Sequence, residues 1–313
     1  EIASCLVGSE MCIRDSSEDG DRAAGGAGNG GAAVIKNPRR IKDLIRNKAQ
    51  GDSTKAQTLQ RHYAMERLLE RISVSRYRDN FILKGGMLVS SMIGIDQRST
   101  MDVDATMTGQ TLSPKNALKI VSEIAAIELD DDMTFEVGDS REIMKNSEYG
   151  GVQIPIRAYL GRMEIKLKID ISTGDAITPS KVAFQFPLML EDRKIDIWAY
   201  NLETVLAEKA ETVIVRGVLN TRMRDFYDIF MLTTVYDPID AAIFRDAIRA
   251  TAANRGHSEY LPRAGEAMSQ IERSSDLSEQ WQRYLVGNPF AVEAKWDDVV
   301  LSVRGLLSTG ELI

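Results

Sequence analysis

The stretch that decides the fold runs from Phe81 to Asp104 and reads FILKGGMLVSSMIGIDQRSTMDVD. Phe81-Ile82-Leu83 predicts a short buried strand, because bulky apolar residues follow one another without interruption. The strand leads into Lys84-Gly85-Gly86, where two residues without a Cβ let the backbone approach a ligand and turn its N–H groups toward an anion. The P-loop pattern G-x-x-x-x-G-K-[ST] is absent. Gly-Gly after a strand is also typical of a plain tight turn.

Asp102-Val103-Asp104 follows about sixteen residues after the glycines and predicts a second strand, over 102–106. Alternate side chains of a strand share a face, so Asp102 and Asp104 point together while Val103 enters the core. Two carboxylates this close repel each other unless a cation lies between them, and oxygen ligands suit Mg²⁺. The alternative is a pair of solvated acids on an edge strand.

Two alternating runs, 152–160 and 163–171, are joined by a turn at Gly161 and predict an antiparallel hairpin. The polar face of the second run carries Glu164, Lys166, Lys168 and Asp170. Asp170 is a candidate third carboxylate, since three acids around two Mg²⁺ can activate a hydroxyl and neutralise a triphosphate. The alternative is an ordinary amphipathic strand with a solvated face, which we prefer for Lys166.

Apolar periodicity predicts the rest of the fold. Helices are expected over 39–48, 53–77, 87–93 and 113–129, the second capped by Ser53 or Thr54, with further strands over 133–137, 182–186 and 195–200. From Leu202 onward the pattern is helical almost throughout. We therefore expect an α/β (α+β) protein in which a half with a mixed sheet, 34–200, precedes an α-helical C-terminal domain, 201–313.

The N-terminal segment differs from the rest of the chain. Residues 1–16 have no helical or strand period and resemble translated adapter sequence, and 17–33 are rich in Gly and Ala. We expect 1–33 to be a disordered or artefactual extension, because it cannot bury enough apolar surface to offset its ordering entropy. Both cysteines lie in the first twelve residues. A folded part that begins near Val34 without cysteine suits a cytoplasmic enzyme.

The chain carries 39 basic and 46 acidic side chains, a net charge of −7, which argues against non-specific binding to nucleic acid. A local basic patch remains compatible with that balance. The helix over 39–48 is such a candidate for RNA phosphates, or else an ordinary solvated face, and its basic residues are Arg39, Arg40, Lys42, Arg46 and Lys48. No apolar run approaches the ~18 residues of a membrane span. His62 and His257 lack metal-ligand spacing, so we expect both to be surface or structural residues.

The helical part places charged residues on apolar faces. Lys209 lies in the apolar stripe of the helix that begins at Leu202, so it either reaches to water or is held for an anion. Asp225 shares a face with apolar residues one and two turns later, and a buried carboxylate needs a partner, which Arg222 or Lys209 could supply. We expect Asp228 to pack or to cap its helix.

Read in order, these motifs resemble the AbiEii/AbiGii nucleotidyltransferase toxin family over roughly residues 36–240. The similar segments are YAMERLLERIS (63–73), FILKGG (81–86), RSTMDVD (98–104), KIDI (168–171), AEK (207–209) and RMRDFYD (222–228). Two positions depart from the family pattern. Met87 stands where Ser or Thr often follows the glycines, and Arg224 stands where Lys commonly precedes the Asp, which keeps the charge but not the geometry.

The resemblance implies a polymerase-β-like nucleotidyltransferase fold, with 34–200 as the nucleotidyltransferase domain. It implies a Mg²⁺-dependent enzyme that moves NMP from an NTP to an acceptor hydroxyl. The implied catalytic residues are Asp102, Asp104, Asp170 and Asp225, of which Asp102, Asp104 and Asp170 bind the metal. The implied nucleotide-binding residues are Lys84, Gly85, Gly86, Thr100, Lys209 and Arg222.

The expected acceptor is the 3′ end of tRNA, and the expected role is that of a toxin in a toxin–antitoxin or phage-defence system with a cognate antitoxin encoded nearby. Two alternatives stay open at this point. The same site could transfer nucleotide to a small molecule or a protein side chain. The chain could also be a catalytically silent nucleotide-binding module, although such a module need not keep polar groups on inward faces.

Overall fold

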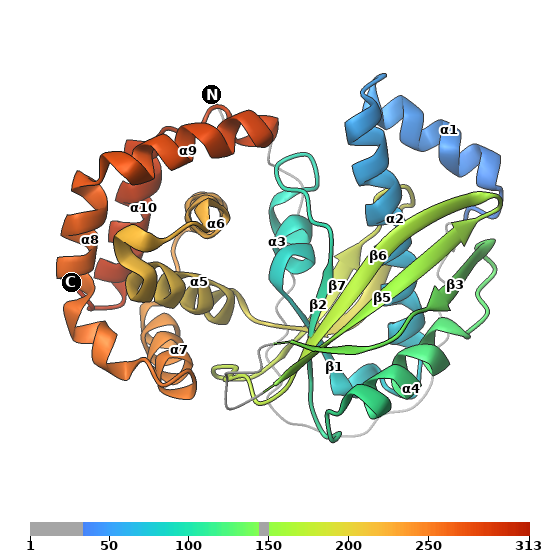
Figure 1. The fold of residues 1–313 in the computed structure, drawn as a ribbon, viewed down its shortest axis with the longest axis horizontal. Coiled ribbons are helices and arrows are strands. Elements are labelled where there is room, and N and C mark those ends of the chain that lie inside the picture. The colour runs from blue at the N-terminus through green and yellow to red at the C-terminus, as the bar shows by residue number, and fades with distance from the viewer. Residues whose placement is uncertain (1–33, 144–149) are drawn as a thin grey trace, which may run out of the picture.

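In a computed structural model of the chain, the structure describes residues 34–143 and 150–313. The expectation for 1–33 therefore lies outside the described residues. The described chain forms two parts, a sheet with helices on one side and a group of helices on the other (Figure 1). The last strand of the sheet ends at Ala199, and the first helix of the second part begins at Leu202.

The sheet is mixed and contains eight strands in the described residues, in the order β3-β5-β6-β2-β1-β8-β7, with β4 paired to β5. Their bounds are β1 Phe81–Lys84, β2 Val103–Met107, β3 Met133–Val137, β4 Arg141–Ile143, β5 Gly151–Leu160, β6 Met163–Ser172, β7 Val182–Pro187 and β8 Lys194–Ala199. The β2–β6 and β1–β8 pairs are parallel and the other pairs are antiparallel. The predicted hairpin is confirmed, with Leu160 opposite Met163 across the turn at Gly161.

The first four helices belong to the sheet-containing part. They are α1 Pro38–Ala49, α2 Ser53–Val74, α3 Gly85–Ile93 and α4 Pro114–Ala125. α2 and α4 pack against the sheet, α1 packs against α2, and α3 lies between the sheet and the helical part (Figure 1). Leu69 and Ile72 of α2 meet Leu83 and Val103 of the central strands. Each such buried aliphatic side chain contributes about 1.5–3 kcal/mol.

Three sequence expectations about these helices were wrong in detail. Asp52, rather than Ser53 or Thr54, caps α2, because its carboxylate accepts the backbone N–H groups of the first turn. α2 ends at Val74 and α4 at Ala125, earlier than the apolar pattern indicated. The two glycines are the first residues of α3 rather than a turn before it, so the helix begins directly at the end of β1.

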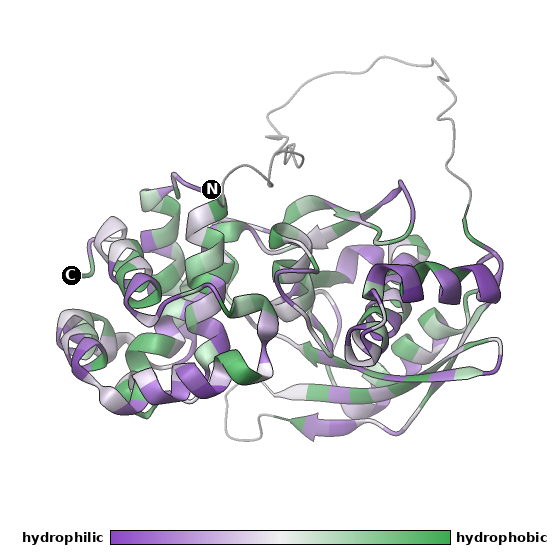
Figure 2. Cartoon of the chain, turned by 90° about the horizontal axis from the view of Figure 1, so that it is seen from above, coloured by the Kyte–Doolittle hydropathy of each residue, from purple (hydrophilic) through white to green (hydrophobic). Residues whose placement is uncertain are grey.

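The long strands follow the predicted alternation. Figure 2 shows hydrophobic and hydrophilic bands alternating along them. In β6, Ile165, Leu167, Ile169 and Ile171 are buried on one face, while the residues between them form the polar face. The apolar face of the sheet packs on α2 and α4, so its polar face is turned toward α3 and the helical part.

The helical part contains α5 Leu202–Arg216, α6 Met223–Val235, α7 Ala241–Asn254, α8 Ala264–Arg273, α9 Ser275–Gly287 and α10 Trp296–Thr309. α6 packs against α3, α5, α9 and α10. Aromatic rings hold it in place: Phe226 lies 5.3 Å from Trp296, and Tyr227 lies 6.5 Å from Trp281, between ring centroids. In the part of the chain that the structure describes, no helix is long and apolar enough to cross a membrane.

Candidate functional site

Three charged residues on neighbouring central strands form the base of the site. In the antiparallel β1–β2 pair Lys84 is opposite Asp104, and in the parallel β2–β6 pair Asp104 is opposite Asp170. Because residues directly opposite each other in a sheet point to the same face, all three side chains emerge together on the polar face. The sequence predicted that Asp102 and Asp104 share a face and that Asp170 is a candidate third carboxylate, and the strand register places Asp170 beside Asp104.

The glycines are explained by the position of Asp104. Gly85 has φ +63, a conformation that favours glycine, and a Cβ on it would lie 2.2 Å from Asp104 Oδ2. The backbone N–H of Gly86 donates to the same carboxylate oxygen at 3.2 Å. Burial raises the pKa of Asp104, the hydrogen bond from Gly86 opposes this, and the nearby Asp170 and Asp102 raise it further.

Thr100 is also placed at the glycines. It is buried, and its hydroxyl donates to the backbone carbonyl of Asp102 at 3.4 Å. A Cβ on Gly86 would lie 2.4 Å from Thr100 Oγ1, so this side chain fills the space that glycine leaves. Thr100 therefore packs against the first residues of α3.

Lys168 lies between two of the predicted metal ligands. Its Nζ is 3.2 Å from Asp102 Oδ2 and 3.1 Å from Asp170 Oδ2. Burial lowers the pKa of Lys168, but the contacts with Asp170 and Asp102 outweigh it and raise the pKa above its usual value. The sequence placed Lys168 on the polar face of its strand but did not single it out as a site residue.

The donor chemistry of these carboxylates fits a hard cation. Asp170 Oδ1 is buried and has no hydrogen-bond partner among the described residues. Two carboxylates already share a cationic group, Lys168, and oxygen ligands are what Mg²⁺ prefers. Within residues 34–143 and 150–313, no three acidic, His or Cys side chains are already gathered into a metal cluster. Asp102, Asp104 and Asp170 are the residues that would hold such a cation.

Lys84 has a second set of partners that the sequence did not reveal. Its Nζ is 2.8 Å from Asp175 Oδ2 and lies 5.5 Å from the ring centroid of Tyr200. The hydroxyls of Thr106 and Ser172 donate to the same Asp175 oxygen, each at 2.5 Å. Burial raises the pKa of Asp175, but Lys84 and the two hydroxyls bring it below its usual value. Asp175 therefore holds the Lys84 ammonium beside Asp104 and Asp170, the two carboxylates that follow Lys84 in the strand register and that we call the carboxylate row.

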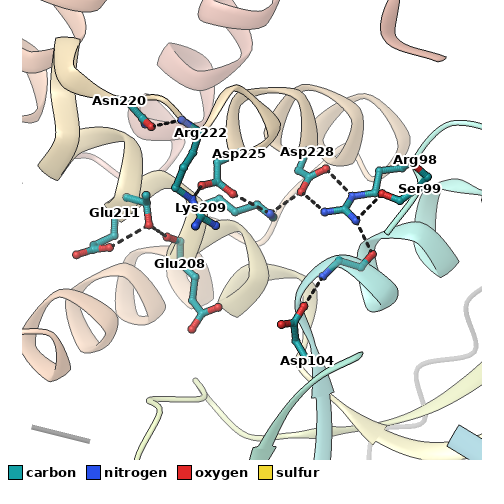
Figure 3. A network of polar contacts seen from close by, with 12 residues as sticks. Arg98, Ser99, Asp104, Glu208, Lys209, Glu211, Asn220, Arg222, Asp225 and Asp228 are labelled. Atoms are coloured by element: carbon teal, nitrogen blue, oxygen red, sulfur yellow. Dashed lines mark hydrogen bonds and ion pairs between the residues drawn. The ribbon is translucent and has the colours of Figure 1, made fainter. Parts of the chain in front are cut away.

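The helical part contributes Lys209 from α5 and Asp225 from α6 (Figure 3). Lys209 Nζ is 3.2 Å from Asp225 Oδ1 and 2.5 Å from Asp228 Oδ2, and the residue is 9% exposed. Arg222 Nε donates to Asp225 Oδ2 at 2.6 Å. Both predicted partners of Asp225 are thus present. Lys209 does not reach to water, because carboxylates of α6 hold it inside.

Asp228 and Arg98 join the two parts of the molecule. Arg98 Nε and Nη2 donate to Asp228 Oδ1 and Oδ2 at 3.1 and 3.2 Å, and Arg98 Nη1 donates to the carbonyl of Gly86 at 3.0 Å. Burial raises the pKa of Asp228, but Arg98 and Lys209 bring it down to about 2. Asp228 does not cap its helix; it packs inside the protein as a fully buried carboxylate between two cations.

The result is an unbroken chain of polar contacts, which we call the interface chain: Arg222, Asp225, Lys209, Asp228, Arg98, Gly86 and Asp104 (Figure 3). It runs from the helical part to the central strands. The structure therefore brings together every predicted site residue, through direct contact or strand register. The two histidines lie elsewhere and pair with glutamates, His62 with Glu66 and His257 with Glu211.

A mixed sheet with paired carboxylates beside glycines, completed by a helical part, is an arrangement that suits a nucleotidyltransferase, and the family of the chain agrees with it. A family model described as nucleotidyl transferase AbiEii toxin, type IV toxin–antitoxin system, matches residues 67–301, and the chain belongs to that family. The family match extends beyond the resemblance that the sequence motifs carried, which ended near residue 240. Membership in a type IV toxin–antitoxin family implies an antitoxin partner.

The chain is similar to JHP933 from Helicobacter pylori and to an H. pylori protein described as a candidate nucleotidyltransferase. Each is 14% identical with a TM-score of 0.46, and the alignments cover 82% of this chain and 94% and 96% of those chains. No curated protein matches the chain.

Proposed function

We propose that the chain is a Mg²⁺-dependent cytoplasmic toxin that transfers NMP from an NTP to the 3′ hydroxyl of tRNA. The observation that carries this proposal is the strand register that aligns Lys84, Asp104 and Asp170 on one face, with the start of α3 directly above Asp104. Cation, carboxylates and backbone N–H groups then meet where a triphosphate needs positive charge and a metal needs oxygen ligands.

The carboxylates of Asp102, Asp104 and Asp170 would hold Mg²⁺, which when bound supplies charge neutralisation for the triphosphate and lowers the pKa of the attacking hydroxyl. Lys84 and the first N–H groups of α3 bind and orient the phosphates, because the N-terminus of a helix carries positive partial charge. Asp175 keeps the Lys84 ammonium in position for this contact with the phosphates.

The helical part closes the site from the other side. Arg222 has a side chain that is 58% exposed, so its guanidinium can contact a bound nucleotide while its Nε stays on Asp225. Lys209 contributes positive charge from inside the interface chain and fixes the position of Asp225. This arrangement supports catalysis by positioning and electrostatic preorganisation, which dominate phosphoryl transfer.

A basic helix is available to an RNA acceptor. α1 is strongly hydrophilic (Figure 2), and Arg39, Arg40 and Arg46 are exposed on it. Contacts of such residues with phosphates position an RNA without reading its sequence. A chain of net charge −7 can therefore still bind tRNA through a local patch.

Incubation with labelled NTPs, Mg²⁺ and total tRNA tests the proposal. The wild type is expected to label tRNA at its 3′ end, and Asp102→Ala and Asp104→Asn are expected to remove the product. Asp96→Asn is the matched control, because Asp96 lies in the loop before β2 and pairs with Lys48 and Lys55 on the surface.

Absence of labelled product with the wild type, or equal labelling by Asp102→Ala, would contradict the proposal. Label that migrates with the protein or with a small molecule would assign a different acceptor to the same chemistry. Calorimetry that shows Mg²⁺-dependent binding of NTP by a wild type that yields no labelled product would support the silent nucleotide-binding module instead.

A further inference from the structure

Lys168 lies in the site but has no role in the proposed reaction described above. Its ammonium lies between Asp102 and Asp170, at 3.2 and 3.1 Å, in the middle of the proposed metal ligands. One ammonium therefore balances two carboxylates that would otherwise repel each other.

The ammonium of Lys168 is exposed enough to solvent to move away from the two carboxylates. The side chain of Lys168 is 35% exposed and that of Asp102 is 30% exposed, so both can regain water when the contact breaks. Ion pairs of such partly exposed groups add little to stability. By contrast, the Arg71–Asp131 pair elsewhere in the same protein is 1% and 0% exposed, so its groups cannot regain water in this way.

The neighbouring lysine of the same strand face shows that the position of Lys168 is specific. Lys166 lies two residues earlier in β6, its side chain is 82% exposed, and its nearest acid is Glu164 at 4.0 Å. The two lysines therefore carry the same charge on the same face, but only Lys168 reaches the carboxylates of the site.

Asp170 supplies a further sign that the site is prepared for a stronger cation. Lys168 satisfies Oδ2 of Asp170, whereas the buried Oδ1 has no partner among the described residues. An ammonium gives only three hydrogen bonds from one point, and a divalent ion binds several carboxylate oxygens at once. A metal would thus engage an oxygen that the lysine leaves unsatisfied.

We propose that the Lys168 ammonium occupies the position between Asp102 and Asp170 as a counter-ion until a divalent cation displaces it. Because it competes with the metal, Lys168 sets the affinity of the site for that cation. This inference rests on the proposed function, because it takes these carboxylates to be metal ligands. Lys168 is a positioning residue of the metal-free site.

Calorimetric titration of the full chain with Mn²⁺ in the absence of nucleotide tests the inference. Lys168→Gln removes the competing ammonium and is expected to bind Mn²⁺ about tenfold or more tightly than the wild type. Lys168→Arg restores a cation and is expected to bind close to the wild type. Lys166→Gln removes the same charge two residues away and is expected to stay within about threefold.

A second measurement uses the wild type alone and is independent of how the variants fold. Amine-reactive labelling, read by mass spectrometry, is expected to modify Lys168 faster when Mn²⁺ is present, because the ammonium has left its carboxylates. Lys166 serves as the internal control and is expected to label at the same rate with and without metal.

The outcomes separate the two proposals. Metal binding by the wild type with equal affinities for Lys168→Gln and Lys166→Gln, or labelling of Lys168 that ignores Mn²⁺, overturns the role of Lys168 and leaves the metal site standing. Absence of Mn²⁺ binding in the wild type and in every variant overturns the metal site of the proposed function, and the role of Lys168 with it.

Discussion

Replacing Asp228 with asparagine tests whether the interface chain stabilises the contact between the two parts of the molecule. The side chain of Asp228 is 0% exposed and forms ion pairs with both Arg98 and Lys209. Asparagine has nearly the same shape, so the substitution removes the negative charge and one acceptor without opening a cavity. Arg98 then keeps its charge in a buried position with only a neutral partner.

The magnitude follows from the pKa of Asp228. A fall from the ordinary 3.8 to about 2 corresponds to roughly 2–3 kcal/mol of stabilisation at pH 7. Removal of one partner from a buried ion pair typically costs about 3–5 kcal/mol. Lys209 keeps Asp225 as a partner, which limits the loss. We therefore expect Asp228→Asn to lose about 2–3 kcal/mol.

The assay is urea denaturation of the wild type and Asp228→Asn over a range of pH. A carboxylate whose pKa is lowered by folding stabilises the protein above its unfolded pKa, and this stabilisation is lost as pH falls through the folded pKa. The difference between the two proteins is thus expected to be constant from pH 7 to about 5 and to narrow between pH 4 and 2.

The control is Asp43→Asn, which removes an exposed carboxylate paired with Arg46 and is expected to change stability by less than about 0.5 kcal/mol. If Asp228→Asn behaves like Asp43→Asn at pH 7, or if its deficit does not change with pH, the reasoning about the interface chain is wrong.

Three further substitutions separate the site from the scaffold. Gly85→Ala places a Cβ 2.2 Å from Asp104 Oδ2 and should lower the rate of nucleotidyl transfer by at least about 100-fold. Gly94→Ala is the control and should retain transfer, because Gly94 has φ +95 and its added Cβ would have no atom within 4 Å. Both variants are measured as initial rates with labelled NTP. Asp131→Asn removes the buried partner of Arg71 and should cost about 3 kcal/mol in urea denaturation with kcat unchanged, so a loss of kcat in the folded variant would place this pair in the mechanism. Lys209→Met should abolish transfer and also destabilise the fold, and full activity in a Lys209→Met protein that melts normally would remove Lys209 from the site.

Local patterns in the sequence predicted much of the fold. Alternation along 163–171 gave the correct buried and polar faces of β6, because side chains of a strand point to opposite faces in turn. The strand before the glycines and the one that contains Asp104 were also predicted from local residues. Helix ends were less accurate, since Asp52 competes with two other good capping residues for the start of α2.

The pairing of strands that are far apart in the sequence could not be predicted from local patterns. Whether Asp170 lies beside Asp104 depends on the parallel pairing of β2 with β6, which no local pattern encodes. For the same reason Asp175, Arg98 and Asp228 were not recognised as members of the site. A buried carboxylate in an apolar helix pattern indicates that a partner exists, but only the folded chain shows that the partner of Asp228 is Arg98, 130 residues earlier.

The residues of the interface chain lie far apart in the sequence, and this has a consequence during translation. Its members extend from Gly86 to Asp228, so the polypeptide must be translated well beyond the sheet before α6 can supply its carboxylates. At roughly 5–20 residues per second, the ribosome needs about 7–30 s to cover that distance. A nascent or prematurely ended chain that stops before α6 has the glycines and the carboxylate row but lacks the partners of Arg98 and Lys209. The polar contacts between the two parts are therefore complete only after α6 has been synthesised.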